Sequence, residues 1–363
     1  MIGPGWKRRL IHDLTHRGVS AWFLSGLITA FYLMLYFTEA LEAPARALGL
    51  PGKWTLYGTI YTIAVVTGGI FVMRRYAHNR YLIIRTWVII GVQVTLAYSI
   101  PIVLQVSGQP EYYFSYFWPL KLDYLNPHYL FQLPLPYILF SFFSSLLLVP
   151  VLGVFFGKRW YCSWVCGCGG LANTFGEPWR HLTSKSTAAW RFERVAIHSM
   201  LALAIGLTAL MFINYAVGSR QPLVAKATHV GQFWYGLVVV GLLSGAIGTG
   251  LYPLGGTRVW CRNFCPMAAL LGLVQKFGRF RVTVKKDMCI SCGLCSKFCE
   301  MGIDVRSYAQ NNLSFTRASC VGCGLCAEVC PRGVLRLENV WTRHPQEAAL
   351  VQIEGARPAP PLI

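Results

Sequence analysis

Charged side chains are scarce in this 363-residue chain: Asp, Glu, Lys and Arg together make up 13% of it, and only 14 residues are acidic. Hydrophobic residues make up 55%, which excludes an ordinary soluble domain. Apolar runs of about 20 residues, the length that crosses the hydrocarbon core of a bilayer, occur at 19–38, 54–73, 86–106, 136–156, 195–217 and 233–253. The chain therefore predicts an all-α polytopic membrane domain of about six transmembrane helices.

Several motifs are also missing. The sequence has no glycine-rich phosphate loop, no dinucleotide-binding glycine motif and no Ser/His/Asp arrangement, so neither nucleotide nor hydrolytic chemistry is indicated. His198 is the only histidine clearly inside a predicted span. A b-type haem held by two histidines would need a second one facing it, and we expect none.

The net charge of +19 raises the question of nucleic-acid binding. Its distribution argues against that function, because acidic and basic residues balance over 287–338 and the surplus lies in the membrane loops and the linker 254–286. Such a pattern is typical of membrane topology and of contact with anionic lipid. It could also steer an acidic redox partner toward the protein.

The basic residues are distributed unevenly between alternate loops. One side of the membrane receives Lys7, Arg8, Arg9, Arg17, Arg74, Arg75, Arg80, Arg85, Lys158, Arg159, Arg180, Lys185, Arg191 and Arg194, and the other receives only Arg46, Lys53, Lys121, Arg220 and Lys226. The positive-inside rule then predicts a multi-pass protein of the bacterial cytoplasmic membrane with both termini in the cytoplasm. Every cysteine falls on that same side.

Eight of the thirteen cysteines form two C-x2-C-x2-C-x3-C runs near the C-terminus, the ligand pattern of two [4Fe–4S] clusters. The fourth cysteine of each run ligates the other cluster. We therefore assign Cys289, Cys292, Cys295 and Cys330 to cluster 1, and Cys320, Cys323, Cys326 and Cys299 to cluster 2. Zinc sites more often use two separated C-x2-C pairs, and disulfides are disfavoured in a reducing cytosol. The segment predicts a small α+β ferredoxin domain of the bacterial type.

Four further cysteines form a second repeat, with a C-x3-C pair after the fourth span (Cys162 and Cys166) and another after the sixth (Cys261 and Cys265). Pro266 suits the first turn of a helix whose amides would point at Cys265. Three interpretations remain open: ligands of a third metal centre, most plausibly another iron–sulfur cluster, a redox-active dithiol site, or packed structural cysteines. Cys168 stays unassigned, with a structural role as the default.

The domain boundaries follow from these motifs. We expect a transmembrane domain with the two C-x3-C motifs at 1–280, a two-cluster ferredoxin domain at 281–338 and a flexible, proline-containing tail at 339–363. The aromatic loop at about 108–135 predicts a segment lying at the membrane interface. For the charged pair Glu177 and Arg180 a solvated loop is favoured.

The chain resembles the NapH/NosR-type membrane polyferredoxins from about 137 to 338. The resemblance is carried by Cys261-Arg-Asn-Phe-Cys265-Pro266 and by the eight-cysteine module. Two features depart from the family pattern: Gly167 replaces proline after the first C-x3-C, and Glu300 replaces proline after Cys299. Neither departure removes a ligand.

This resemblance implies a membrane-bound iron–sulfur protein that relays electrons between the quinone pool, or a membrane partner, and a redox protein. It would act as a quinol dehydrogenase-type subunit of anaerobic respiration. Two alternatives remain. One is an accessory factor that supplies electrons for assembling or reactivating another metalloenzyme, and the other is a membrane-anchored metal reductase. Direct reaction with quinone would distinguish the relay from the assembly factor.

Overall fold

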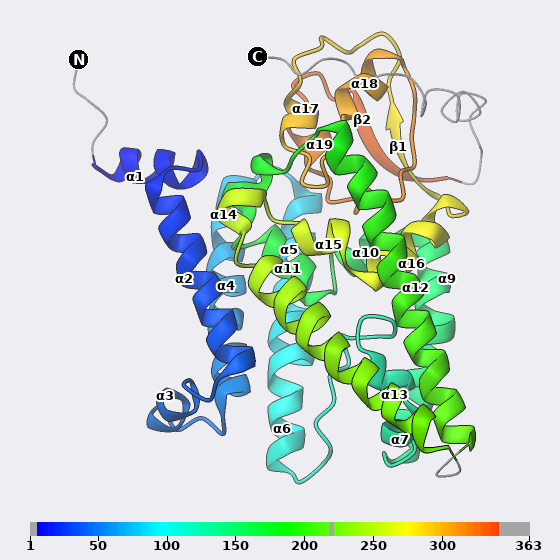
Figure 1. The fold of residues 1–363 in the computed structure, drawn as a ribbon. Coiled ribbons are helices and arrows are strands. Elements are labelled where there is room, and N and C mark those ends of the chain that lie inside the picture. Colours follow the sequence, from blue (N-terminus) through cyan, green and yellow to red (C-terminus); the bar gives the residue numbers. More distant parts are fainter. Residues whose placement is uncertain (1–5, 218–220, 341–363) are drawn as a thin grey trace.

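In the computed structural model, which describes residues 6–217 and 221–340, six helical segments are long and apolar enough to cross a membrane (Figure 1). They are α2 (Val19–Phe37), α4 (Lys53–Arg75), α5–η1–α6 (Arg80–Val94, Thr95–Ser99, Ile100–Val106), α8–η3–α9 (Leu135–Phe142, Phe143–Leu148, Val149–Phe156), α12 (Thr187–Val217) and α13–η6 (Pro222–Trp234, Tyr235–Ile247). The predicted all-α membrane domain with six spans is confirmed.

The boundaries of the spans differ from the prediction most at the sixth, which begins at Pro222 rather than at 233 and ends at Ile247. Lys226 and His229 consequently lie within α13 instead of in a loop, so His198 is not the only histidine in a spanning helix. The span predicted from the sequence begins after these two polar residues, because that prediction assigns them to a loop. A lysine near a helix end can extend its charged group to the membrane surface, so such a residue does not mark where the helix begins.

The loop between α6 and α8 is expected from the sequence to lie along the membrane interface, and this prediction is wrong. The loop turns back among the helices (Figure 1), with Tyr112, Phe117 and Tyr124 buried. The Tyr161 hydroxyl donates a hydrogen bond to the Ser115 carbonyl at 3.0 Å. The loop therefore reaches the segment that carries the first C-x3-C pair. It contains η2 (Leu122–Leu125) and α7 (Pro127–Leu130).

Short helices fill the ends of the bundle. They are α1 (Trp6–Thr15), α3 (Glu42–Ala47), α10 (Arg159–Cys162), α11 (Gly167–Asn173), η4 (Glu177–Leu182), α14 (Tyr252–Gly255), α15 (Val259–Asn263) and α16 (Pro266–Lys276). Helix α3 lies at the end of the bundle opposite the C-terminal module, whereas α10, α11, α15 and α16 lie toward that module (Figure 1). These four helices carry the C-x3-C cysteines or follow them.

The C-terminal module combines one small sheet with short helices, which confirms the α+β prediction. Strands β1 (Phe280–Val284) and β2 (Leu335–Asn339) pair antiparallel, with Phe280 opposite Asn339. Between them lie α17 (Leu294–Lys297), α18 (Val305–Gln310) and α19 (Leu325–Glu328). The domain boundary at 281 stays a prediction, although β1 begins beside it. The predicted tail lies outside the described residues from 341 onward.

Candidate iron–sulfur sites

The four cysteines assigned to cluster 1 line a single pocket of the ferredoxin module. Burial raises the pKa of Cys295 to about 11, and the neighbouring thiols of Cys330, Cys289 and Cys292 add to the shift. Cys292 is exposed, and the adjacent Ile290 is 56% exposed. This group, called the cluster 1 set, therefore lies at the outer surface of the module.

The four cysteines assigned to cluster 2 also lie together. Burial raises the pKa of Cys320 to about 12, with Cys299 and Cys323 adding to the effect, and the pKa of Cys326 is raised by burial and by the same neighbours. Thiols with such pKa values are protonated at neutral pH, whereas a metal ligand must be a thiolate. Bound iron would supply the positive charge that the buried thiolates need. The donors of this cluster 2 set therefore suit a [4Fe–4S] cluster.

The loop that carries Cys320 and Cys323 is attached to the membrane domain through its backbone carbonyls. Every carbonyl in the following list accepts a hydrogen bond from a membrane-domain side chain: Arg317 and Cys320 from Gln275 (2.8 and 3.1 Å), Ala318 from Lys158 (3.2 Å), Val321 from Ser163 (2.7 Å), Gly322 from Tyr81 (2.9 Å) and Cys323 from Arg85 (2.5 Å). The cluster 2 set is therefore the part of the ferredoxin module that faces the membrane domain.

The two C-x3-C pairs lie in the same buried region, with Cys265 within electrostatic range of Cys162, Cys166 and Cys261. Among the described residues, no group of three or more Cys, His, Asp or Glu side chains is close enough to hold a single metal ion. Cys162, Cys166, Cys261 and Cys265 are 4–5% exposed and belong to the same packed core, although they come from two separate loops. We call them the membrane-face set. The first cysteine of each pair lies in a short helix, α10 or α15, and the second caps the next helix, α11 or α16. The sequence repeat is thus also a structural repeat.

Hydrogen-bond donors point at these sulfur atoms. The Ala268 amide in the first turn of α16 donates to Cys265 Sγ at 3.4 Å, as the position of Pro266 predicted. The Cys168 thiol and the Gly169 amide lower the pKa of Cys166 to about 7. Burial raises the pKa of Cys162 to about 12. Four neighbouring sulfurs, two of them with backbone amides directed at them, suit an anionic iron–sulfur cluster. Cys168, left unassigned from the sequence, lies beside Cys166.

A glycine precedes each C-x3-C pair where the chain leaves a helix. Gly157 (φ +69°) and Gly256 (φ +89°) both occupy the left-handed region, with ψ near 180°. Residues with a Cβ rarely adopt that conformation. At Gly256 an added Cβ would also lie 2.3 Å from Thr183 Oγ1. The matching glycines in the sequence repeat therefore form matching turns that direct the cysteines inward.

Replacing Gly256 with alanine is expected to destabilise the protein by about 1–3 kcal/mol. Alanine would be strained in this left-handed conformation, and its added methyl group would overlap Thr183. Thermal unfolding in detergent, followed together with iron content, measures this effect. Gly206→Ala on α12 is the matched control, since an added Cβ there meets nothing within 4 Å. Equal melting temperatures for the two variants would contradict the role assigned to Gly256.

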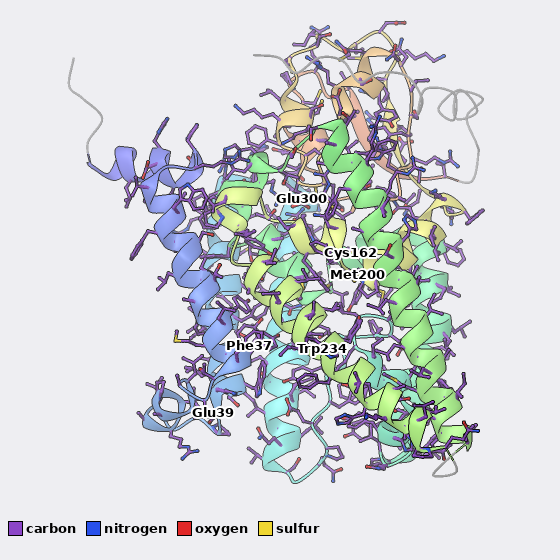
Figure 2. All side chains as sticks on the ribbon, in the orientation of Figure 1. Phe37, Glu39, Cys162, Met200, Trp234 and Glu300 are labelled. Atoms are coloured by element: carbon purple, nitrogen blue, oxygen red, sulfur yellow. The ribbon has the colours of Figure 1, made fainter. Side chains whose placement is uncertain are left out.

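The departure at Glu300 has a structural explanation. This carboxylate follows Cys299 of the cluster 2 set, is completely buried, and lies 3.0 Å from both Arg258 and Arg180. Arg258 also approaches Cys261 Sγ at 3.8 Å and donates to the Cys162 carbonyl at 3.0 Å. Figure 2 shows Glu300 and Cys162 toward the same end of the bundle, with Glu39 at the other end. Glu300 thus connects the ferredoxin module to the membrane-face set.

The electrostatics of Glu300 follow from its two partners. Burial alone would raise its pKa, but the guanidinium groups of Arg180 and Arg258 outweigh burial and lower the pKa below its ordinary value. The carboxylate is therefore ionised between two buried cations. Proline at this position could not make these contacts, which gives a physical reason for glutamate after Cys299.

The solvated loop expected around Glu177 and Arg180 is not observed. Glu177 is 4% exposed and is held by Arg75 at 2.9 Å and by the Tyr76 hydroxyl at 2.7 Å, while Arg180 is 1% exposed. Arg85, counted as a loop residue from the sequence, is likewise buried and contacts the cluster 2 loop. Each of these charges has its partner in another segment, which sequence reasoning missed.

Comparison with known proteins agrees with these sites. Residues 282–337 match a family model described as a 4Fe-4S dicluster domain. A second model, described as a 4Fe-4S binding domain, matches residues 138–184 and again 236–285, and these two segments contain the two C-x3-C pairs. Both cysteine regions therefore resemble iron–sulfur domains.

Three relatives share part of the chain. The putative electron transport protein YccM of Escherichia coli is 27% identical over 42% of this chain and 44% of its own length. The methylamine utilization ferredoxin-type protein MauN of Paracoccus denitrificans is 28% identical over 42% of this chain and 52% of its own. The uncharacterized protein MJ0749 of Methanocaldococcus jannaschii is 23% identical over 44% and 58%. The chain spans about half the length of these relatives, and no solved structure matches it.

The six spans, the two kinds of cysteine region and these matches define the class of the molecule. Its two cysteine regions are similar to 4Fe–4S domains, and its six spans are typical of a multi-pass membrane protein. In this combination the chain is similar to membrane polyferredoxin-like 4Fe–4S proteins, as the resemblance of its motifs implied.

Proposed function

We propose that this chain transfers single electrons between a membrane quinone and a redox protein, as a quinol dehydrogenase-type subunit of anaerobic respiration. The cluster 1 and cluster 2 sets would each hold a [4Fe–4S] cluster, and the membrane-face set would hold a third. When bound, these clusters supply one-electron transfer. We further propose that the cysteines face the cytoplasm of a bacterium, in accordance with the positive-inside rule.

The serial arrangement of the three cysteine sets is the observation that carries this proposal. The membrane-face set is buried within the membrane domain, the cluster 2 loop is attached directly to that domain, and Cys292 of the cluster 1 set is exposed. Arg258 touches the membrane-face set and, through Glu300, the cluster 2 set. This order of the three sets suits electron transfer from the membrane interior to a partner protein that docks near the exposed Ile290.

A pocket lined by residues of α4, α6 and the loop that follows α6 supports the quinone part of the proposal. Its lining includes Trp54, Tyr98, Ile102, Glu111 and Tyr113. Glu42, Lys53, Thr55 and Gln105 also line it. Polar groups beside aromatic and aliphatic side chains suit a flat headgroup with an apolar tail. The Tyr113 hydroxyl donates a hydrogen bond to Glu111, which could accept a proton when quinol loses two electrons and two protons.

The pocket lies close to the membrane-face set along two elements. Gly58 lines the pocket, and Tyr61 lies three residues further along α4, a rise of about 5 Å; its hydroxyl donates to the Gly167 carbonyl at 2.8 Å. In the re-entrant loop, the rings of Tyr113 and Tyr116 are 5.8 Å apart, and Tyr116 is within electrostatic range of Cys166. A quinol in the pocket would therefore lie near the first cysteine set.

Glu111→Gln and Tyr113→Phe are expected to slow reduction of the clusters by quinol about a hundredfold, because proton removal from quinol loses its acceptor. Stopped-flow spectroscopy of the reconstituted protein measures this rate. Tyr129→Phe, in the same loop but outside the pocket lining, is the matched control.

The possible results separate the proposals. If quinol reduces the wild-type protein and both pocket variants at one rate, this pocket is not the quinol site. If the wild-type protein reacts with neither quinol nor quinone, the quinone part of the proposal fails and an accessory role gains support. Reoxidation of the reduced clusters by copper or iron ions would instead indicate a metal reductase.

A further inference from the structure

A second pocket lies where the ferredoxin module meets the ends of α12 and α16. Three Lys or Arg residues line it: Arg194 of α12, Lys276 in the last turn of α16, and Arg317, three residues before Cys320. His198 of α12 lines it as well. Ile197, Ala268 and Gly272 add apolar surface. Membrane helices and the cluster 2 loop thus form this pocket together.

The positive charges of the pocket are not matched by its one carboxylate. Glu193 also lines the pocket, but its Oε2 accepts a hydrogen bond from Arg262 Nε at 2.7 Å and its Oε1 accepts one from the Ser319 hydroxyl. Its charge is therefore offset by Arg262. The three cations of the pocket leave a net positive charge, which favours an anionic ligand.

Aromatic stacking holds two of these cations in place. The guanidinium carbons of Arg194 and Arg317 lie 4.9 and 5.5 Å from the Trp190 ring centre. Tryptophan commonly occupies the level of lipid headgroups. Because Trp190 contacts one arginine from the membrane domain and one from the cluster 2 loop, an anion bound there would contact both parts of the protein.

The depth of the pocket identifies the kind of anion. Helix α12 has 31 residues and is therefore about 46 Å long, which exceeds a hydrocarbon core of about 30 Å. Its three charged residues, Arg191, Glu193 and Arg194, all lie in its first eight positions, so the excess length is at the ferredoxin end. Val195, next to Arg194, is 70% exposed and apolar, as expected where lipid begins. The pocket thus lies at the headgroup level.

We propose that this pocket binds the phosphate headgroup of an anionic phospholipid such as phosphatidylglycerol. The phosphate would lie among Arg194, Lys276 and Arg317, with the acyl chains following α12 into the bilayer. The lipid would then strengthen the attachment of the cluster 2 loop to the membrane domain. This assignment does not depend on the identity of the electron donor.

The test compares wild-type protein with Arg194→Gln, Lys276→Gln and Arg317→Gln in nanodiscs of phosphatidylcholine with and without phosphatidylglycerol. Lipid retained after detergent exchange is measured by mass spectrometry, and protection of 316–323 is measured by hydrogen exchange. Each lost charge is expected to lower phosphatidylglycerol retention about fivefold. Arg191→Gln, on the same helix but outside the pocket lining, should retain lipid as the wild type does.

The iron content of each variant shows whether that variant is folded. The three single variants are compared with the wild type separately, so the test still stands if one of them fails to fold. Preferential retention of phosphatidylglycerol by the wild type, together with weaker protection of 316–323 in phosphatidylcholine alone, would support the assignment. Equal retention by the wild type and the pocket variants would overturn it. So would variants that keep the lipid but lose binding of an acidic redox protein, since the pocket would then be a protein-docking site.

Discussion

Replacing Glu300 with glutamine is expected to weaken the attachment of the ferredoxin module by about 3–5 kcal/mol. The change removes one charge from a buried group and leaves Arg180 and Arg258, which are 1% and 0% exposed, without their counter-ion. Faster release of iron to a chelator in urea measures the loss of stability. The lost negative charge beside Cys299 should also raise the reduction potential of the cluster 2 set, which a redox titration measures.

Glu328→Gln provides the matched control, because Glu328 also joins the module to the membrane domain. Glu328 is 11% exposed; it lies 2.5 Å from His78 and also accepts a hydrogen bond from Asn79. Because His78 is 73% exposed, solvent screens the charge of the histidine. We expect a change of about 0–1 kcal/mol and an unaltered potential. If Glu300→Gln behaves like this control, the buried carboxylate does not hold the two parts together.

Replacing Cys261 with serine is expected to lower the iron content from about twelve atoms per chain to about eight, because one [4Fe–4S] cluster of three would be lost. Iron and acid-labile sulfide are measured on protein purified without oxygen, with electron paramagnetic resonance of the reduced form. The ferredoxin clusters should keep their signals. Cys168→Ser should retain about twelve irons, since Cys168 contacts the membrane-face set without belonging to it.

The iron content of the wild-type protein by itself tests whether the membrane-face set holds a cluster. About eight irons per chain would mean that only the cluster 1 and cluster 2 sets hold clusters. The membrane-face set would then be a dithiol site or a structural feature, and an accessory function would become the better proposal. The first step of the proposed route would also lose its acceptor.

Features that depend on local spacing could be predicted from the sequence. A loop with cysteines three residues apart wraps its thiols around one centre wherever it is folded, so the cysteine runs were enough to predict the ferredoxin module. The position of Pro266 likewise predicted the start of α16, and uncharged runs predicted the six spans. Each of these inferences needs only neighbouring residues.

Features that depend on partners from distant segments could not be predicted. The residues next to Glu300 in the sequence do not show that it is buried. Its partners Arg180 and Arg258 come from separate loops of the membrane domain. The prediction for the aromatic loop at about 108–135 failed for a different reason. Tyrosine and tryptophan suit both a membrane interface and a protein interior, so composition did not distinguish a surface segment from one that turns inward, as shown by Tyr112.

The close attachment of the cluster 2 loop has a consequence for biogenesis. Ser163, between Cys162 and Cys166, donates its hydroxyl to the Val321 carbonyl at 2.7 Å, and both partners are buried. Close-packed interiors leave no passage for a preformed iron–sulfur cluster. If the membrane-face set holds a cluster, as proposed, we expect that cluster to be delivered before the ferredoxin module docks. The helices would then insert first, the centre at the membrane face would be loaded next, and the module would pack over it last.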